Sequence, residues 1–86
     1  MSKQRIAKPK GNKQLWIFYS HFNKTYWDNK LPVPMLLVFD ELKDDDDGVQ
    51  QFMTSGSIRI IINRDYKKHP DMAAIALLHE MIHVSM

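Results

Sequence analysis

The final segment of the chain, Met72 to Met86, constrains the fold more than any other. Its only charged side chain is Glu80, and its only other polar side chains are His79, His83 and Ser85. The segment follows a Pro-Asp pair, which suits the first turn of a helix. A helix that is apolar on nearly every side is typical of one buried in a domain. We therefore expect a buried helix from about residue 70 to the last residue.

The polar residues of this helix are spaced as a zinc peptidase requires. His79 and His83 are four residues apart, so they lie one turn apart on the same face and their ring nitrogens can converge on one ion. Glu80 lies about 100° further round, beside such an ion. This is the H-E-x-x-H pattern, in which two histidines hold zinc and the glutamate acts as general base. The alternative is a pair of core histidines bonded to backbone carbonyls.

The rest of the chain reads as an α+β domain, in the order helix, three strands, helix. A first helix is expected from Lys13 to about Asp28, with Asn12 as its N-cap and a stop at Asn29. Leu15, Tyr19, Phe22 and Tyr26 recur at three- and four-residue spacing and are expected in the core, while polar residues such as Asn23 can face water. Short apolar or β-branched runs predict strands, and we expect a small, mainly antiparallel sheet packed on the helices. The predicted strands are Met35–Asp40, Val49–Thr54 and Ile58–Asn63.

Composition limits the chemistry and the setting of the domain. With 86 residues the chain can form one domain at most. It has no cysteine, so any metal must be held by His, Asp or Glu, and disulfides are excluded. No apolar run is long enough to cross a bilayer, and no apolar signal core follows the N-terminus. We expect a cytoplasmic protein that does not associate with membranes.

Positive charge is concentrated at the N-terminus. The formal net charge is +2, yet five basic residues precede residue 14: Lys3, Arg5, Lys8, Lys10 and Lys13. The sequence predicts a flexible basic tail over residues 1–11, followed by the domain over residues 12–86. Such a tail could contact the phosphates of DNA, or it could simply be solvated.

Three stretches of the chain resemble the SprT-like (Spartan-type) zinc metallopeptidases. Phe22–Pro32 is similar to the end of the family's first helix, Ile58–Asn63 to the strand before its active-site helix, and Leu77–His83 to that helix itself. The resemblance implies a zincin-like fold, zinc bound by His79 and His83, and Glu80 as the catalytic residue. It also implies a metalloendopeptidase that acts on protein or peptide substrates on or near DNA.

One part of the family pattern is missing from the sequence. The resemblance implies a third zinc ligand, usually a histidine downstream of the active-site helix, whereas the sequence ends three residues after His83. We therefore expect the front part of a SprT-like domain, truncated after the motif, with water or another chain completing the site. A truncated or inactive domain that binds protein or DNA is the alternative. His69 lies about 15 Å of helix rise from His79, and His21 is expected at the surface, so neither is expected to bind the metal.

Two further features have simpler explanations. The acidic run Asp44–Asp47 does not fit a calcium loop, because Lys43 and Thr54 would occupy positions that require acids, so we expect a solvated turn. The aromatic residues of the first helix could stack on nucleic acid bases, but their helical spacing favours a core role. A substrate peptide could pair with an edge strand, either Val49–Thr54 or Ile58–Asn63.

Overall fold

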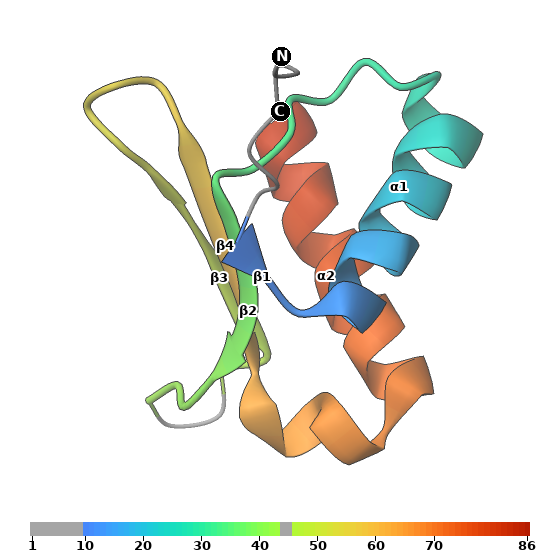
Figure 1. The fold of residues 1–86 in the computed structure, drawn as a ribbon, viewed down its shortest axis with the longest axis vertical. Helices are drawn as coiled ribbons and strands as arrows, with labels where there is room; N and C mark the ends of the chain where they lie inside the picture. Colours follow the sequence, from blue (N-terminus) through green and yellow to red (C-terminus); the bar gives the residue numbers. More distant parts are fainter. Residues whose placement is uncertain (1–9, 44–45) are drawn as a thin grey trace, which may run out of the picture.

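The computed structural model describes residues 10–43 and 46–86. It confirms the predicted α+β class and the order of helix, three strands and helix (Figure 1). A short 3₁₀ helix, η1, links the last strand to the last helix, and a two-residue strand, β1, precedes the first helix. The elements are β1 (Lys10–Gly11), α1 (Lys13–Trp27), β2 (Leu36–Asp40), β3 (Gly48–Phe52), β4 (Ile58–Asn63), η1 (Arg64–Lys68) and α2 (Pro70–Ser85).

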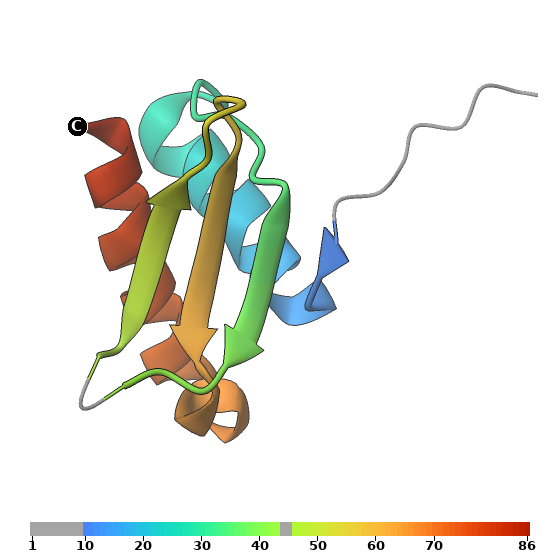
Figure 2. The same cartoon turned by 90° about the vertical axis from the view of Figure 1, so that its left-hand side faces the viewer.

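The sheet is mixed, so the expectation of a mainly antiparallel sheet was wrong. Its order is β1-β2-β4-β3, and only the β3–β4 pair is antiparallel. After β2 the chain crosses the end of β4 and enters the sheet at its far edge (Figure 2). It then returns through a tight turn into β4, which therefore runs parallel to β2. Strands that follow one another in sequence often pair directly, and here β2 and β3 do not.

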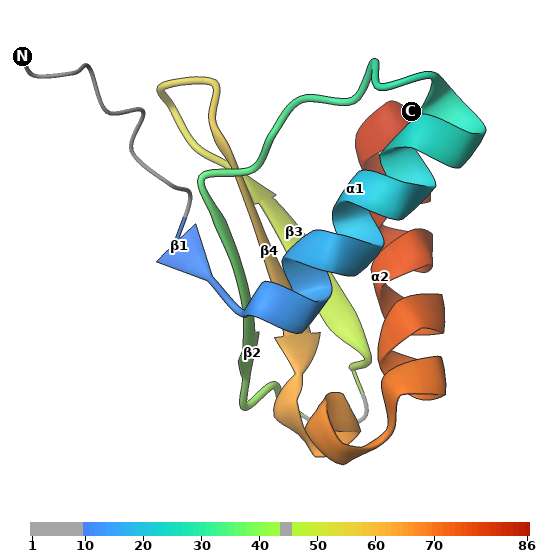
Figure 3. The ribbon, with the colours of Figure 1, turned by 45° about the vertical axis from the view of Figure 1, so that its right-hand side comes forward.

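Both helices lie on the same face of the sheet. In Figure 3, α1 passes in front of α2, and the two stand to one side of the strands. α2 contacts β3 and β4, whereas α1 contacts β2 and α2. The strands alternate accordingly, with Ile58, Ile60 and Ile62 of β4 buried and the residues between them partly exposed. Together with Leu37 and Leu77 they form the centre of the core, which fixes α2 against the sheet.

The first helix begins and ends as the sequence predicts. The Asn12 side chain caps it by accepting hydrogen bonds from the backbone N–H groups of Gln14 and Leu15, at 2.8 and 3.2 Å. At the other end Asp28 and Asn29 both adopt positive φ angles.

The inner face of α1 differs from the prediction. Asn23, expected in water, is buried and holds the connector after the helix through two hydrogen bonds to the Leu31 backbone. Tyr26, expected in the core, is 62% exposed. A side-chain amide can be buried at this position because both of its functional groups are paired.

The second helix is buried on one face only, which corrects the expectation of burial all round. Ala73, Ala76, Leu77, Glu80 and Met81 face the core. The opposite face leaves large apolar side chains in solvent, among them Met72, Ile75, Ile82 and Met86.

Two further expectations concern membrane association and the basic N-terminal tail. No helix among the described residues has the length and apolar character needed to span a membrane. The predicted basic tail lies mostly in residues 1–9, outside the described residues. Its last two residues, Lys10 and Gly11, pair with Leu36 and Leu37 as strand β1.

Candidate metal centre

The two histidines of the motif converge at the surface of α2. Both side chains are exposed, and their Nε2 atoms are 3.0 Å apart. In a tetrahedral zinc site with Zn–N bonds of 2.0–2.1 Å, two ligand nitrogens stand about 3.3 Å apart. The arrangement of His79 and His83 therefore fits a shared zinc ion with only a small adjustment of the rings.

Glu80 occupies the inner side of the same helical turn. It is only 5% exposed, and it lines the same pocket as Gly48 of β3. A Cβ atom at position 48 would stand 3.0 Å from Ile62 Cδ1 and 3.1 Å from both the Glu80 Cγ and the Ile61 carbonyl oxygen, so these neighbours would have to shift by a few tenths of an ångström. A side chain at position 48 would therefore crowd Glu80.

The environment of Glu80 favours its protonated form. Burial is the main cause, and it raises the pKa of this carboxyl above its usual value. The nearby imidazoles of His79 and His83 lower the pKa, while Asp46 and Asp47 raise it again. A carboxylate with a raised pKa is a better proton acceptor, as general-base catalysis requires.

These three residues line one side of a shallow pocket of about 360 Å³. The other side is formed by β3, through Gly48, Val49 and Gln50, and by Asp46 from the acidic turn. The motif therefore faces the edge of the sheet. The sequence identified the motif and offered Val49–Thr54 as one possible substrate edge, but it did not place Asp46 and Gly48 opposite the motif, because only the pairing of β3 brings them there.

Strand β3 is the free edge beside the motif. It ends the strand order, so among the described strands only β4 pairs with it. Asn63 N donates a hydrogen bond to Asp47 O, and Met53 N donates one to Ser57 O. Asp47 and Met53 are therefore residues whose backbone groups bond across the β3–β4 pair. In an antiparallel pair the bonded residues alternate, which leaves the backbone N–H and C=O groups of Gly48, Gln50 and Phe52 pointing outward.

The acidic turn is anchored next to the pocket. The Tyr66 hydroxyl donates a hydrogen bond to the Asp47 carboxylate, and Asn63 Nδ2 donates one to Asp46 O at 2.9 Å. Both aspartates are exposed, as expected for a solvated turn. Asp44 and Asp45, the first half of the predicted turn, lie outside the described residues.

No third ligand stands beside the two histidines in the described part of the chain. No group of three or more His, Cys, Asp or Glu side chains there could hold a metal ion. His21 and His69 are exposed, and neither lines the pocket. Asp46 lines it, but the described geometry does not group its carboxylate with the histidines.

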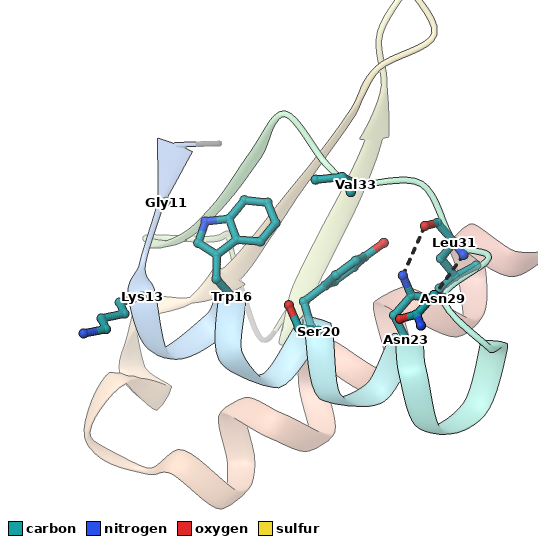
Figure 4. A pocket seen from close by; sticks show the side chains of 9 residues that line it. Gly11, Lys13, Trp16, Ser20, Asn23, Asn29, Leu31 and Val33 are labelled. Carbon is teal, nitrogen blue, oxygen red and sulfur yellow. Dashed lines mark hydrogen bonds between the residues drawn. The ribbon is translucent and has the colours of Figure 1, made fainter. Parts of the chain in front are cut away.

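A second, larger pocket of about 760 Å³ lies beside α1 (Figure 4). It shares no lining residue with the pocket at the motif. It is mainly apolar, with Trp16, Tyr19 and Val33 among its lining residues and Lys13 at its rim. The Tyr19 hydroxyl donates a hydrogen bond to Pro32 O at 2.5 Å, which fixes the connector over the helix. The aromatic residues of α1 thus serve partly as core and partly as a pocket wall.

Comparison of the chain with protein-family models, with curated proteins and with solved structures found no match.

Proposed function

We propose that this protein is a SprT-like zinc metallopeptidase that hydrolyses peptide bonds in protein substrates. The observation that carries the proposal is the convergence of the His79 and His83 Nε2 atoms at 3.0 Å beside a buried Glu80. These two histidines would hold the zinc ion, which when bound lowers the pKa of water to near neutrality and polarises a carbonyl.

Glu80 is the proton-transfer group of the proposed reaction. Its carboxylate accepts a proton from the attacking water and passes it to the leaving amine. Its pKa is raised by burial, which strengthens it as a base, and the core holds it in place. Gly48 contributes by leaving space for the side chain.

Strand β3 is the proposed substrate platform. Of the two strands considered from the sequence, β4 is flanked by β2 and β3, whereas β3 is an edge and lines the pocket. An extended peptide can add to this edge through the outward backbone groups of Gly48 and Gln50. Its scissile carbonyl would then lie between β3 and the histidines.

The test combines metal analysis with a matched pair of substitutions. Purified protein should bind zinc and cleave an unfolded protein substrate, and Glu80→Gln should lose cleavage while it retains zinc. Glu41→Gln is the control, because Glu41 is exposed and lies outside the pocket. Protein that binds no zinc, or that cleaves equally well with Glu80→Gln, would contradict the proposal.

An intracellular location is part of the proposal, since the chain has no cysteine.

A second candidate is a domain that binds protein or DNA without catalysis. The basic N-terminal sequence and the pocket with Trp16 and Lys13 favour it, because a base could stack on the indole beside a cation. It predicts salt-sensitive binding to single-stranded DNA that weakens when residues 1–9 are deleted or Trp16→Ala is introduced. Glu80→Gln should leave this binding unchanged, which separates the two candidates.

A further inference from the structure

The pocket beside α1 has a deep apolar wall. Its volume of about 760 Å³ lies in the range of small-molecule sites, about 300–1,000 Å³. Tyr19, Asn23 and Leu31 line it and are buried, so the pocket extends inward to the core. The Tyr19 hydroxyl and the Asn23 amide are already bonded to the backbone of the connector after α1. This wall therefore offers a ligand mainly ring and aliphatic surface.

One hydrogen-bond donor at this pocket has no partner. Among the described residues, Trp16 Nε1 is the one buried side-chain nitrogen or oxygen that makes no hydrogen bond. Figure 4 shows Trp16 rising from α1 into the region between Gly11 and Val33. A Cβ atom at position 11 would stand 2.7 Å from this nitrogen, so the donor lies at the Gly11 end of the pocket. A small rotation of the indole presents it to a ligand acceptor, which a buried N–H group requires.

The same end of the pocket carries a single positive charge. Lys13 is the only charged residue that lines the pocket, and in the described part of the chain the one ion pair joins Arg64 and Glu41. In Figure 4 the Lys13 ammonium lies in solvent, and its flexible four-carbon stem allows it to turn over the opening. One cation without a neighbouring carboxylate suits one negative charge. A nucleic acid strand brings a phosphate with every nucleotide and is bound through several cations.

From these observations we infer that the pocket beside α1 binds a carboxylate with an apolar body. The acid group accepts hydrogen bonds from Trp16 Nε1 and Lys13 Nζ at the Gly11 end, where charge assistance strengthens both. The apolar body lies along the Tyr19 ring and Leu31, with Val33 on its outer side. This binding site goes beyond the proposed peptidase activity, because the pocket shares no lining residue with the pocket at the motif.

The experiment is calorimetric titration of the full chain with decanoate. One site per chain is expected. Decanol has the same chain length and no charge, so it should bind at least about 10-fold more weakly, equivalent to 1.4 kcal/mol. Acetyl-trileucine with a free carboxylate distinguishes two sources of the same chemistry. Tighter binding of this peptide would assign the site to the C-terminus of a peptide, and tighter binding of decanoate would assign it to a free acid.

Two substitutions test the polar end. Lys13→Gln should lower the affinity for decanoate by up to about 5-fold and leave that for decanol unchanged. Lys24→Gln is the control, because Lys24 is exposed on α1 and outside the pocket. Trp16→Phe keeps an aromatic ring but removes the N–H group, so it should weaken decanoate binding about 10-fold and decanol binding less.

A matched pair of exposed apolar residues tests the wall. Val33→Asp places a negative charge beside the apolar body and should lower the affinity for decanoate at least about 10-fold, equivalent to 1.4 kcal/mol. Ile17→Asp is the control, because Ile17 is exposed on α1 and does not line the pocket. Circular dichroism should show that both variants are folded, as expected for substitutions at the surface.

The contrary results are distinct from failure of the peptidase proposal. Glu80→Gln and a zinc chelator should leave decanoate binding unchanged, so the result stands with or without a zinc site. Equal affinity for decanoate and decanol, or equal weakening by Val33→Asp and Ile17→Asp, would overturn the inference. Binding of single-stranded DNA without binding of either carboxylate would also overturn it and assign the pocket to nucleic acid.

Discussion

At the scale of single residues, the candidate site depends on a position that has no side chain. Gly48 of β3 lies opposite Glu80 of α2, and a Cβ atom at position 48 would stand 3.1 Å from the Glu80 Cγ. Overpacking a close-fitting site typically costs about 1–3 kcal/mol and shifts its neighbours. Small displacements of a catalytic group can cost on the order of 10²-fold in rate.

Gly48→Ala should therefore impair catalysis more than folding. We expect kcat/KM for a peptide substrate to fall on the order of 10²-fold, with retained zinc binding. Gly56→Ala is the control, because Gly56 has a φ of +90° and no atom near its missing Cβ, so it loses stability without touching the site. Equal activity of Gly48→Ala and Gly56→Ala would contradict the role of Gly48.

A second residue-scale prediction concerns Tyr19. Burial raises the pKa of its phenol from 10.0 to about 12, so the folded protein keeps this proton while the unfolded chain loses it. The free energy of unfolding should therefore fall as pH rises from about 10 through 12, by roughly 2–3 kcal/mol in total. The Tyr19→Phe variant has no phenol, so its stability should not fall in this way. At pH 7 the variant should be about 1 kcal/mol less stable than the parent protein, because it lacks the hydrogen bond to Pro32.

Urea denaturation of the Tyr19→Phe variant and the parent protein across this pH range provides the measurement. The stability difference between them should shrink and then reverse above pH 11. A difference that stays constant from pH 7 to pH 12 would show that this phenol does not titrate differently in the folded state.

At the scale of elements, the backbone N–H groups of edge strand β3 alternate between facing β4 and facing outward. The N–H groups of Val49 and Gln51 belong to the residues paired with β4, whereas that of Gln50 faces outward. Proline removes a backbone N–H donor and is tolerated on an edge strand where that donor is free. Position 50 is therefore a place where substrate pairing can be weakened while the ladder is preserved.

Gln50→Pro should lower kcat/KM by about 10-fold, the value of one lost hydrogen bond. Gln50→Ala keeps the N–H group and should retain most of the activity, which separates the backbone from the side chain. Gln51→Pro should instead destabilise the fold, as measured by urea denaturation. Equal activity of Gln50→Pro and Gln50→Ala would exclude pairing of the substrate with this part of β3.

At the scale of the whole molecule, metal binding and folding should be linked. A ligand that binds only the folded state at 100 times its dissociation constant adds about 2.7 kcal/mol of stability. For a domain of this size each kcal/mol corresponds to about 4–8 °C, so zinc should raise Tm by roughly 10–20 °C. Calorimetry with zinc and with a chelator checks this, with Glu80→Gln keeping the shift and His83→Ala losing it. An identical Tm in both conditions would contradict a zinc site.

Much of the architecture could be predicted because local signals and tertiary structure agree. Asn12 marks the start of α1 by capping it, and Pro70 marks the start of α2 through its ring geometry. The β-branched run Ile58–Asn63 marks β4 through its packing. Each of these signals acts over a few residues. The partner of β2 could not be predicted, since pairing with β4 depends on how the chain crosses the sheet. The burial of Asn23 was missed for a related reason, because its partner Leu31 lies beyond the helix end.

Part of the candidate site could likewise be predicted from the sequence, and part could not. His79, Glu80 and His83 lie within one turn and a half of helix, so their spacing alone predicts their relative positions. Gly48, Gln50 and Asp46 reach the pocket only through the register of β3 on β4. Their sequence neighbourhood gives no chemical signal, and a glycine beside an acidic run reads as a turn.

The connection from β2 to β3, which passes the end of β4, has a consequence for the order in which the chain assembles. The β3–β4 hairpin joins residues close in sequence, whereas the parallel β2–β4 pair must first close a loop of about twenty residues. Loop closure costs entropy before contacts repay it, so the hairpin should form in the folding transition state and β2 should dock afterwards. Ile60→Val should then slow folding, while Leu37→Ala should mainly accelerate unfolding. Stopped-flow measurements that place the slowing at Leu37 instead would reverse this order.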